Sequence, residues 1–292
     1  LTTDSSGNGF SLSNYGGLYE FKSEKNSILF QNSNYSVINS NLDWNSFSNL
    51  SISGWFNTSN FKNNDTMLNF DIPQTNTLFP PTGMSGFTST ISGIVYRACA
   101  STYYGTGYEP WRVFNRNVSS IYASASMFSS SGTVNPGTGV SFGTDTTYKG
   151  FYIGIDMGQQ FVMKSYTITP RTGFTHRRPK NWKIYATNND ACWNTSGGTG
   201  NTGSLNTAST WVQIDVRANE TTYTSTTTFN LTNNITKYRY YAINANQLQG
   251  PSDASYFDLA EWYIYGYVPK CLKISYENSN LSFQINNTSV YE

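Results

Sequence analysis

The chain has 292 residues and a formal net charge of +1, with 18 Lys or Arg residues balanced by 17 Asp or Glu residues. This balance gives no electrostatic case for a nucleic-acid partner, because phosphate binding requires a basic surface. No apolar run reaches transmembrane length, so no membrane span is expected. Aromatic residues make up 16% of the chain and charged residues only 12%, so Asn, Ser, Thr and Tyr must supply much of the surface.

Short stretches of alternating apolar and polar residues recur along the chain. No sustained stretch has apolar residues at the i, i+3, i+4, i+7 spacing of an amphipathic helix. Clusters of Gly, Asn, Pro and Ser separate the alternating stretches at short intervals. This pattern is typical of an all-β sandwich. The sequence divides into three regions, which are residues 1–88, 92–268 and 270–292.

Residues 1–88 contain three notable segments, "DSSGNG", "NSILF" and "LSISGWFNTSNFKNNDTMLNF". Their order is Asp-x-Ser-Gly-Asn, then an apolar strand, then hydrophobic-Ser-hydrophobic-x-x-Trp-hydrophobic. This order resembles the opening half of a laminin-G or concanavalin A-like jelly roll. The next segment, "IPQTNTLFPPTGMSG", is rich in Pro, Thr and Gly and is interpreted as a linker.

Residues 92–268 contain five segments in the order of a known family. They are "ACASTYYGTGYEPWRVFNRN", "YIGIDMGQQFVMKSYTI", "RRPKNWKIYATNNDACW", "YRYYAINANQ" and "DLAEWYIYG". The third matches the pattern Arg-x-Pro-x-x-Trp, and together the segments resemble the discoidin family, also called coagulation factor 5/8 type C. The resemblance implies a galactose-binding-like jelly roll of eight strands. Many binding modules share this fold, so it says little about the ligand.

Two loops of this block are candidate ligand-binding segments, because the resemblance implies that loops at this end of the sandwich carry the ligand. The loop Ser101–Trp111 contributes three tyrosines, which can recognise a ligand or pack beneath the loop. The loop Arg171–Pro179 can donate hydrogen bonds to sugar hydroxyls and stack an aromatic ring on a sugar, or it can be a solvated, mildly basic loop. The candidate ligand-binding residues are Tyr103, Tyr104, Tyr108, Arg171, Phe174, His176 and Arg177.

The segments "WRVFNRN" and "AEW" suggest a calcium site, since the resembled family often holds calcium with an Asp after the Phe and a Glu beside the last strand. The corresponding residues are Asn115 and Glu261. An amide oxygen can serve as a calcium ligand, but the loss of one carboxylate should weaken the affinity. The alternative is a hydrogen-bonded crossing of the chain ends. No other cofactor is expected.

A catalytic centre is not expected. His176 is the one histidine, so a histidine-based metal cage is not available, and it lies in a basic loop rather than beside an aspartate as a Ser-His-Asp triad requires. A carboxylate pair for glycoside hydrolysis stays open among the 17 acidic residues, but most of them lie in loops without a motif. We therefore predict that the protein is not an enzyme.

Residues 270–292 follow the block 92–268, whose last segment is the expected final strand of a complete domain. Alternation before and after a turn at 278–280 predicts a hairpin with one apolar face, made of Leu272, Ile274, Tyr276, Leu281, Phe283 and Ile285. An isolated hairpin is marginally stable in water, so this one needs a partner sheet.

The hairpin sequence "LKISYENSNLSFQINN" fits the strands that follow the opening half of a laminin-G-like jelly roll. We predict two β-sandwich jelly rolls, with the discoidin-like domain 92–268 inserted into a laminin-G-like sandwich formed by 1–88 and 270–292. Insertion is feasible because domain termini tend to lie close together. These residues supply fewer strands than a complete laminin-G fold needs. Either the sandwich is reduced or the polypeptide continues past Glu292.

Three cysteines are too few for a disulfide scaffold or a metal knuckle. Cys99 opens the discoidin-like block and Cys271 follows its last strand, and the resembled fold has its two ends close together. A Cys99–Cys271 disulfide is therefore predicted, with Cys192 unpaired. About a dozen N-x-S/T sequons permit glycosylation, but a chain so rich in Asn, Ser and Thr contains about that number by chance.

The resemblance implies a carbohydrate-binding or adhesion protein on an extracellular or particle surface, which binds a glycan or glycoprotein through the discoidin-like loops. The alternative is a structural or minor surface component of a virus particle or other assembly, held by contacts with other copies or with capsid or assembly proteins. The two classes predict different surfaces. A lectin-like protein needs an exposed aromatic residue and hydrogen-bonding side chains in a concave site, whereas an assembly protein needs flat apolar patches or unpaired edge strands.

Overall fold

The fold was analysed in a computed structural model. It describes residues 76–194, 204–221, 225–231, 233–250 and 254–269 with their side chains, and the backbone of six strands outside this range. The chain divides into two compact units, a flanking unit formed by Leu1–Pro73 with Lys270–Glu292 and a central unit formed by Gln74–Pro269. The described elements are strands and short 3-10 turns, which agrees with the predicted all-β class. In this described part of the chain, no helix has the length and apolar character needed to cross a membrane.

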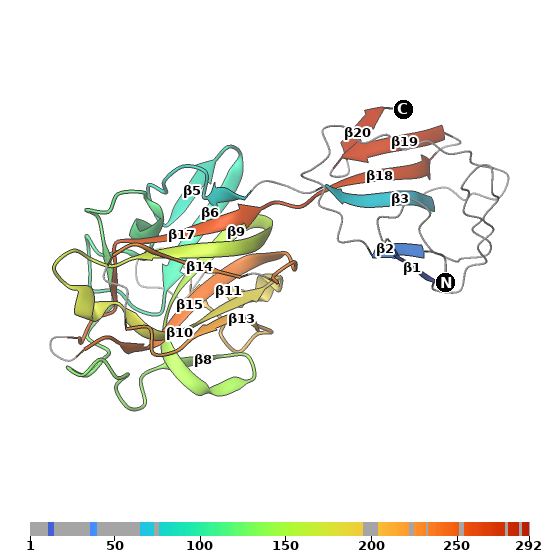
Figure 1. The fold of residues 1–292 in the computed structure, drawn as a ribbon. Helices are drawn as coiled ribbons and strands as arrows, with labels where there is room; N and C mark the ends of the chain where they lie inside the picture. Colours follow the sequence, from blue (N-terminus) through green and yellow to red (C-terminus); the bar gives the residue numbers. More distant parts are fainter. Residues whose placement is uncertain are drawn as a thin grey trace. The chain divides into compact units, whose positions relative to one another are not determined.

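The flanking unit contains two antiparallel sheets (Figure 1). Strand β1 (Ser11–Asn14) pairs with β2 (Ser36–Asn39). The second sheet has the order β20-β19-β18-β3. Its strands are β3 (Asp65–Ile72), β18 (Lys270–Glu277), β19 (Asn280–Ile285) and β20 (Thr288–Tyr291).

The C-terminal hairpin pairs with a strand that precedes the central unit. Strands β18 and β19 form the hairpin, and β18 also pairs with β3. Leu272 lies opposite Phe70 on one side and Ile285 on the other, and Ile274 lies opposite Leu68. The register therefore places apolar positions of the three strands opposite one another. This register explains why the alternation continues beyond the end of the central unit.

The laminin-G resemblance stays a prediction. Two of the segments that carry it, residues 4–9 and 26–30, lie outside the described residues, and so does the part of the third at 50–64. The segment predicted to be a linker contains a strand. Strand β4 (Thr77–Phe79) pairs with β17 (Glu261–Tyr267), and the Phe79 ring packs on Phe161 with centroids 4.5 Å apart. The sequence analysis missed this three-residue strand because the segment around it is rich in Pro and Gly.

The central unit is a sandwich of two antiparallel sheets that share strand β9. The first sheet has the order β13-β10-β15-β9-β6-β5, and the second has the order β14-β9-β17-β4. The strands not yet given are β5 (Thr88–Ile91), β6 (Ile94–Ala100), β9 (Asp145–Thr169), β10 (Pro179–Thr187), β13 (Val212–Arg217), β14 (Thr227–Asn230) and β15 (Tyr238–Leu248).

Shorter elements connect these strands. They are β7 (Tyr122–Ala123), β8 (Val140–Phe142), β11 (Trp193–Asn194), β12 (Ser204–Leu205) and β16 (Asp258–Leu259), with 3-10 turns η3 (Pro110–Phe114), η4 (Thr175–Arg177) and η5 (Asp190–Cys192). The β7–β16 pair places Ala123 opposite Asp258. This pair brings two chain segments together at one end of the sandwich.

Strand β9 is one continuous strand of 25 residues, although its sequence reads as two. It pairs with β15 and β6 in its first part and with β17 and β14 in its second. The change of sheet occurs at Gly158, which has a φ of +68°. A Cβ there would lie 2.4 Å from the Val95 carbonyl oxygen, so the position requires glycine.

The main core lies between the two sheets. The first sheet contributes Ile153, Trp182 and Ile243, and the second contributes Tyr166 and Trp262, all of them fully buried. Alternation along each strand places these residues on the inner face.

A second apolar cluster covers the outer face of the first sheet. Tyr152 and Tyr185 project from the sheet into this cluster, where Leu205 and Trp211 cover them. The Leu205 backbone N–H donates to the Tyr152 hydroxyl at 3.0 Å. The segment after Cys192 therefore holds two residues that bury part of the sheet.

The predicted Cys99–Cys271 disulfide is contradicted, because Cys99 is a free thiol. Because side chains alternate along β6, Ala98 points into the main core and Cys99 points into the second cluster, where it is fully buried with Cys192. Cys192 is also free, as predicted. Burial raises the pKa of the Cys192 thiol to about 12. The side chain of Cys271 lies outside the described residues.

Candidate functional site

The two loops that the sequence singled out meet at one pocket of about 230 Å³ in the central unit. This loop pocket is lined by Tyr104, Tyr108, Ala123, Arg171, Phe174, Arg177 and Tyr256. Besides Ala123 of β7, three chain segments contribute to it, two of them the predicted loops and the third the segment before β16.

The first loop is shaped by two glycines and by hydrogen bonds to its backbone. Gly105 and Gly107 have positive φ angles of 150° and 96°, and the Tyr108 N–H donates to the Gly105 carbonyl at 3.0 Å. The Tyr104 N–H donates to the Ala123 carbonyl at 2.9 Å, which anchors the loop to β7. Because Ala123 is paired with Asp258, this anchor holds the tyrosines beside the third segment.

The second loop folds into successive tight turns. The Phe174 N–H donates to the Arg171 carbonyl at 3.2 Å, and the Arg177 N–H donates to the Phe174 carbonyl at 3.0 Å. Both guanidinium groups contact the Phe174 ring, with Cζ 4.1 Å from its centroid for Arg171 and 4.5 Å for Arg177. The ring that was predicted to stack on a sugar therefore supports the two arginines.

A buried carboxylate lies beneath the two arginines. Asp258 is fully buried, and its Oδ2 accepts a hydrogen bond of 3.1 Å from Nη1 of Arg171 and another of 3.1 Å from Nη1 of Arg177. Burial raises the pKa of Asp258, although both arginines act in the opposite direction. Its Oδ1 has no hydrogen-bond partner among the described residues. The carboxylate holds both guanidinium groups in place and offsets one of their two charges.

The aromatic wall of the loop pocket carries the most exposed ring of the site. Tyr104 is 61% exposed, and its ring makes edge contacts with Tyr108 at 5.4 Å and with Tyr256 at 5.6 Å. The Arg177 guanidinium lies 4.8 Å from the Tyr256 ring centroid. The pocket therefore combines an exposed aromatic ring with two cationic hydrogen-bond donors.

Five of the seven predicted ligand-binding residues line this pocket, and the other two do not. Tyr103 packs on Phe87 with ring centroids 6.0 Å apart. The His176 ring lies 6.0 Å from Phe174, and its Nε2 is buried without a hydrogen-bond partner among the described residues. Sequence reasoning missed Tyr256 and Asp258. Their signal was an aromatic residue and an acid in the loop just before the last core strand.

The predicted calcium residues lie at a separate place. Glu261 in β17 is fully buried, and neither carboxylate oxygen makes a hydrogen bond to the described residues. Burial raises the pKa of Glu261 to about 8, while the backbone N–H groups of Asn117 and Arg116 and the Arg116 charge lower it. The Asn115 side chain accepts a hydrogen bond from the Asn117 N–H at 2.8 Å, which shapes this loop.

These residues fit a calcium ion in one respect. A buried carboxylate whose oxygens make no direct hydrogen bond is costly unless a cation or a proton neutralises it. Loop carbonyls and the Asn115 amide are oxygen donors of the kind that calcium accepts. The described residues contain no group of three or more His, Cys, Asp or Glu side chains that could hold a metal. The donor set has a single carboxylate, which favours weak binding.

Comparisons with solved structures find similar β-sandwich modules. A family 32 carbohydrate-binding module from Clostridium perfringens, solved with GalNAc-β-1,3-galactose, is 13% identical, with a TM-score of 0.39 over 58% of this chain and 94% of that chain. Another such module, from a family 31 glycoside hydrolase of the same organism, is 13% identical, with a TM-score of 0.41 over 62% and 95%. A fucolectin from Morone saxatilis serum is 15% identical, with a TM-score of 0.35 over 60% and 46%.

No protein-family model matches the chain, and no curated protein matches it either.

Proposed function

We propose that the central unit binds a glycan in the loop pocket, and that the protein is a non-catalytic adhesion protein displayed on an extracellular or particle surface. One observation carries this proposal. Tyr104, at 61% exposure, stands beside Arg171 and Arg177 in a concave site. An exposed aromatic residue flanked by hydrogen-bonding side chains is the arrangement that distinguishes a lectin-like site from an assembly surface.

Each part of the pocket has a role in this account. The Tyr104 ring stacks on the apolar face of a sugar, and the tyrosines on its edges limit its motion. Arg171 and Arg177 donate hydrogen bonds to sugar hydroxyls. Because Asp258 and Phe174 already hold the guanidinium groups, little side-chain entropy is lost on binding. Single-site affinity should be weak, since every hydroxyl must exchange a hydrogen bond with water, so repeated display would supply avidity.

Binding without catalysis suits the carboxylates of this site. Glycoside hydrolysis generally uses two carboxyl groups flanking the scissile bond. No carboxylate is among the described residues that line the loop pocket, and Asp258 beneath it is fully buried and paired with both arginines. We therefore assign these residues to recognition.

A glycan array probed with the full chain tests this proposal. We expect wild-type protein to be retained on a defined set of glycans, and Tyr104→Ala to bind them at least about tenfold more weakly, which corresponds to about 1.4 kcal/mol. Val118→Ala is the matched control, because Val118 is also an exposed apolar side chain, at 54%, outside the pocket. Retention of folded Tyr104→Ala at the wild-type level would overturn the assignment of this pocket.

The assembly role remains the second candidate, and one observation favours it. Among the described strands, β13 pairs on one side only, with β10, and it exposes Val212 at 44% and Val216 at 51%. An edge strand with exposed apolar residues can pair with another chain. Sedimentation velocity over a concentration series tests this role. Self-association that Val216→Lys abolishes would favour the assembly role over the glycan-binding role.

We also propose that Glu261, Asn115 and the carbonyls of the 115–117 loop hold a calcium ion with a structural role. The unpaired, buried carboxylate of Glu261 supports this proposal. Millimolar calcium should raise the melting temperature of the wild type, and magnesium should do so less because it demands stricter geometry. Glu261→Gln should remove the calcium effect. Equal responses of wild type and Glu261→Gln would exclude this site.

A further inference from the structure

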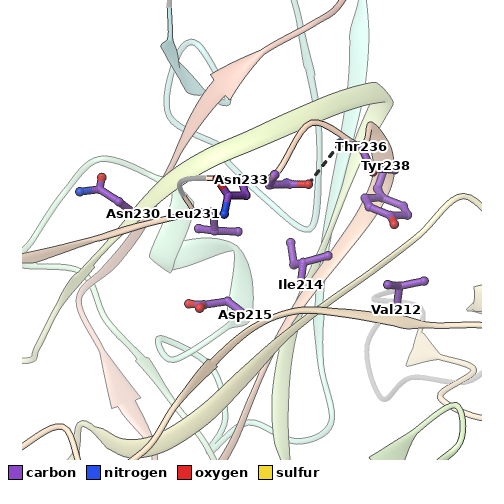
Figure 2. A pocket seen from close by; sticks show the side chains of 9 residues that line it. Val212, Ile214, Asp215, Asn230, Leu231, Asn233, Thr236 and Tyr238 are labelled. Atoms are coloured by element: carbon purple, nitrogen blue, oxygen red, sulfur yellow. Dashed lines mark hydrogen bonds between the residues drawn. The ribbon is translucent and has the colours of Figure 1, made fainter. Parts of the chain in front are cut away.

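A second and larger pocket, of about 420 Å³, shares no lining residue with the loop pocket. We call it the side pocket. Its walls come from β13, from the end of β14 and from the segment that leads to β15 (Figure 2). Figure 2 shows Val212 and Tyr238 on one side, Asn230 on the opposite side and Ile214 between them.

The side pocket lies where an edge of each sheet comes close to the other. Among the described strands, β13 pairs only with β10 in the first sheet, and β14 pairs only with β9 in the second. No described strand fills the space beside these edges. The segment after β14 crosses it, beginning at buried Leu231, and half-buried Ile214 faces it from β13. The pocket therefore has an apolar base made of aliphatic side chains.

A carboxylate held by two hydrogen bonds lines this pocket. Asp215 Oδ2 accepts hydrogen bonds from the Tyr166 hydroxyl at 2.6 Å and from Arg217 Nε at 2.8 Å. The Tyr166 hydroxyl in turn accepts from Trp182 Nε1 at 2.8 Å. Asp215 Oδ1 has no such partner among the described residues, and the Asp215 side chain is 14% exposed. The core thus holds an acceptor ready for a ligand hydroxyl.

The asparagines of the side pocket divide into one structural residue and two with open amides. Asn234 Nδ2 donates to the Met163 carbonyl at 2.8 Å, and its Oδ1 accepts from the Thr236 N–H at 3.2 Å. These bonds fix the segment that crosses the pocket. The side chains of Asn230 and Asn233 are exposed and make no hydrogen bond to the described residues. They can donate to and accept from a ligand at the same time.

Apolar and aromatic side chains stand beside these amides. Val212 is 44% exposed, and Tyr238 is half-buried with its ring held edge-on by Tyr241 at 6.3 Å. Among the described residues, the lining contains no Lys, Arg or His, and its one charged residue, Asp215, is paired with Arg217. Because this ion pair carries no net charge, a neutral ligand with hydroxyl donors fits the side pocket better than a charged ligand.

We propose that the side pocket binds a pyranose that carries an N-acetyl group, as a carbohydrate site separate from the loop pocket. The acetamido methyl packs on the aliphatic base, and the acetamido amide pairs with the side chain of Asn230 or Asn233. A ring hydroxyl donates to Asp215 Oδ1. Tyr238 offers an apolar ring face to the sugar. A hexose without the N-acetyl group would leave the aliphatic base uncovered and lose one amide pairing.

The test follows the signals of the side-pocket asparagines by NMR in the full chain, expressed without N-glycosylation because Asn230 lies in an N-x-T sequon. N-acetylglucosamine is the probe and glucose is the matched sugar. Tyr104→Ala is the background, so that the loop pocket does not contribute. Val212→Trp fills the pocket from its rim, and Val216→Trp is the control, because it adds the same ring on the same strand outside the lining.

We expect N-acetylglucosamine to shift the Asn230 and Asn233 signals in the Tyr104→Ala background and in Val216→Trp. Binding should be at least about tenfold weaker in Val212→Trp, and glucose should bind at least about tenfold more weakly than N-acetylglucosamine. If Val212→Trp does not fold, Asn233→Ala takes its place with the same expected loss, because Asn233 is exposed. An absence of shifts, equal binding by Val212→Trp and Val216→Trp, or equal binding of both sugars would overturn the proposal. None of these outcomes bears on the glycan array, which tests the loop pocket by itself.

Discussion

The loop pocket and the side pocket belong to the same β-sandwich, but their chemistry is opposite. The loop pocket presents two arginines over a fully buried aspartate, with an exposed tyrosine beside them. The side pocket presents one carboxylate, paired with Arg217, and two open amides over aliphatic side chains. The first is a set of hydrogen-bond donors, and the second offers an anionic acceptor with neutral amides.

The difference follows from where each pocket lies in the fold. The loop pocket is built by chain reversals, whose glycines and tight turns bring side chains from three segments together. The side pocket is built by two strands that lack a neighbour on one side within the described residues. Loops can vary without disturbing the core, whereas Asp215 is tied to Trp182 in the core through Tyr166. A change at the exposed Tyr104 should therefore alter binding first, and a change at Asp215 should alter stability first.

Removing both cations of the loop pocket should have the largest effect on the free energy of unfolding. In the double variant Arg171→Ala with Arg177→Ala, the Asp258 carboxylate stays buried without its partners. We expect the free energy of unfolding to fall by about 3–5 kcal/mol, as when one partner of a buried ion pair is removed. Urea denaturation measures this loss. Adding Asp258→Asn to the double variant should recover part of it, and no recovery would contradict the role of the buried charge.

Breaking the hydrogen bond between Asp215 and Tyr166 behind the side pocket should have an intermediate effect on the free energy of unfolding. Asp215→Ala leaves the buried Tyr166 hydroxyl without its acceptor, which should lower the free energy of unfolding by about 1–3 kcal/mol. Asn233→Ala on the rim of the same pocket should change it by less than about 0.5 kcal/mol, because Asn233 is exposed. Similar losses in the two variants, measured by urea denaturation, would show that the core does not hold the carboxylate as described.

Glu261 extends the comparison to a buried acid whose carboxylate oxygens have no hydrogen-bond partner among the described residues. Its pKa rises to about 8 from the ordinary 4.5, so the folded state keeps a proton that the unfolded state releases. In calcium-free buffer, the free energy of unfolding should therefore fall as the pH rises from about 4.5 to 8, by up to about 1.4 kcal/mol per pH unit from this group. Glu261→Gln should flatten this part of the pH profile. An unchanged slope in Glu261→Gln would contradict the raised pKa.

The smallest effect on stability is expected where the effect on binding is greatest. Tyr104 is 61% exposed, so Tyr104→Ala should change the free energy of unfolding by less than about 0.5 kcal/mol. A larger loss in thermal or urea unfolding would mean that the ring supports the loop, and a loss of glycan binding could then not be assigned to stacking.

The loop pocket could largely be predicted from the sequence. The tyrosines of the 101–111 loop flank two glycines, and Arg171, Phe174 and Arg177 lie in a short loop between strands, so all were expected in turns at one end of the sandwich. The sequence could not show that Tyr103 and His176, unlike their neighbours in the same loops, do not line the pocket. Which side chains of a tight loop face a pocket depends on its φ angles and on contacts such as Phe87 with Tyr103.

The side pocket and the free Cys99 show what the sequence could not predict. The side pocket depends on where two strands end as edges, which is a property of the assembled sheets rather than of any motif. Cys99 lies in a strand with apolar residues on both faces, so alternation did not reveal that its thiol enters the second cluster. The outer face of the first sheet forms a second core because Leu205 and Trp211 cover it, and the sequence did not indicate this contact.

The central claim is that a glycan binds in the loop pocket. The most direct measurement is an amide chemical-shift titration of the full chain with the glycan that the array selects. The account predicts shifts at the backbone amides of Gly105, Gly107 and Gly173, which lie in the two loops, and their loss in Tyr104→Ala. Binding of the same glycan with these three amides unshifted would contradict the account.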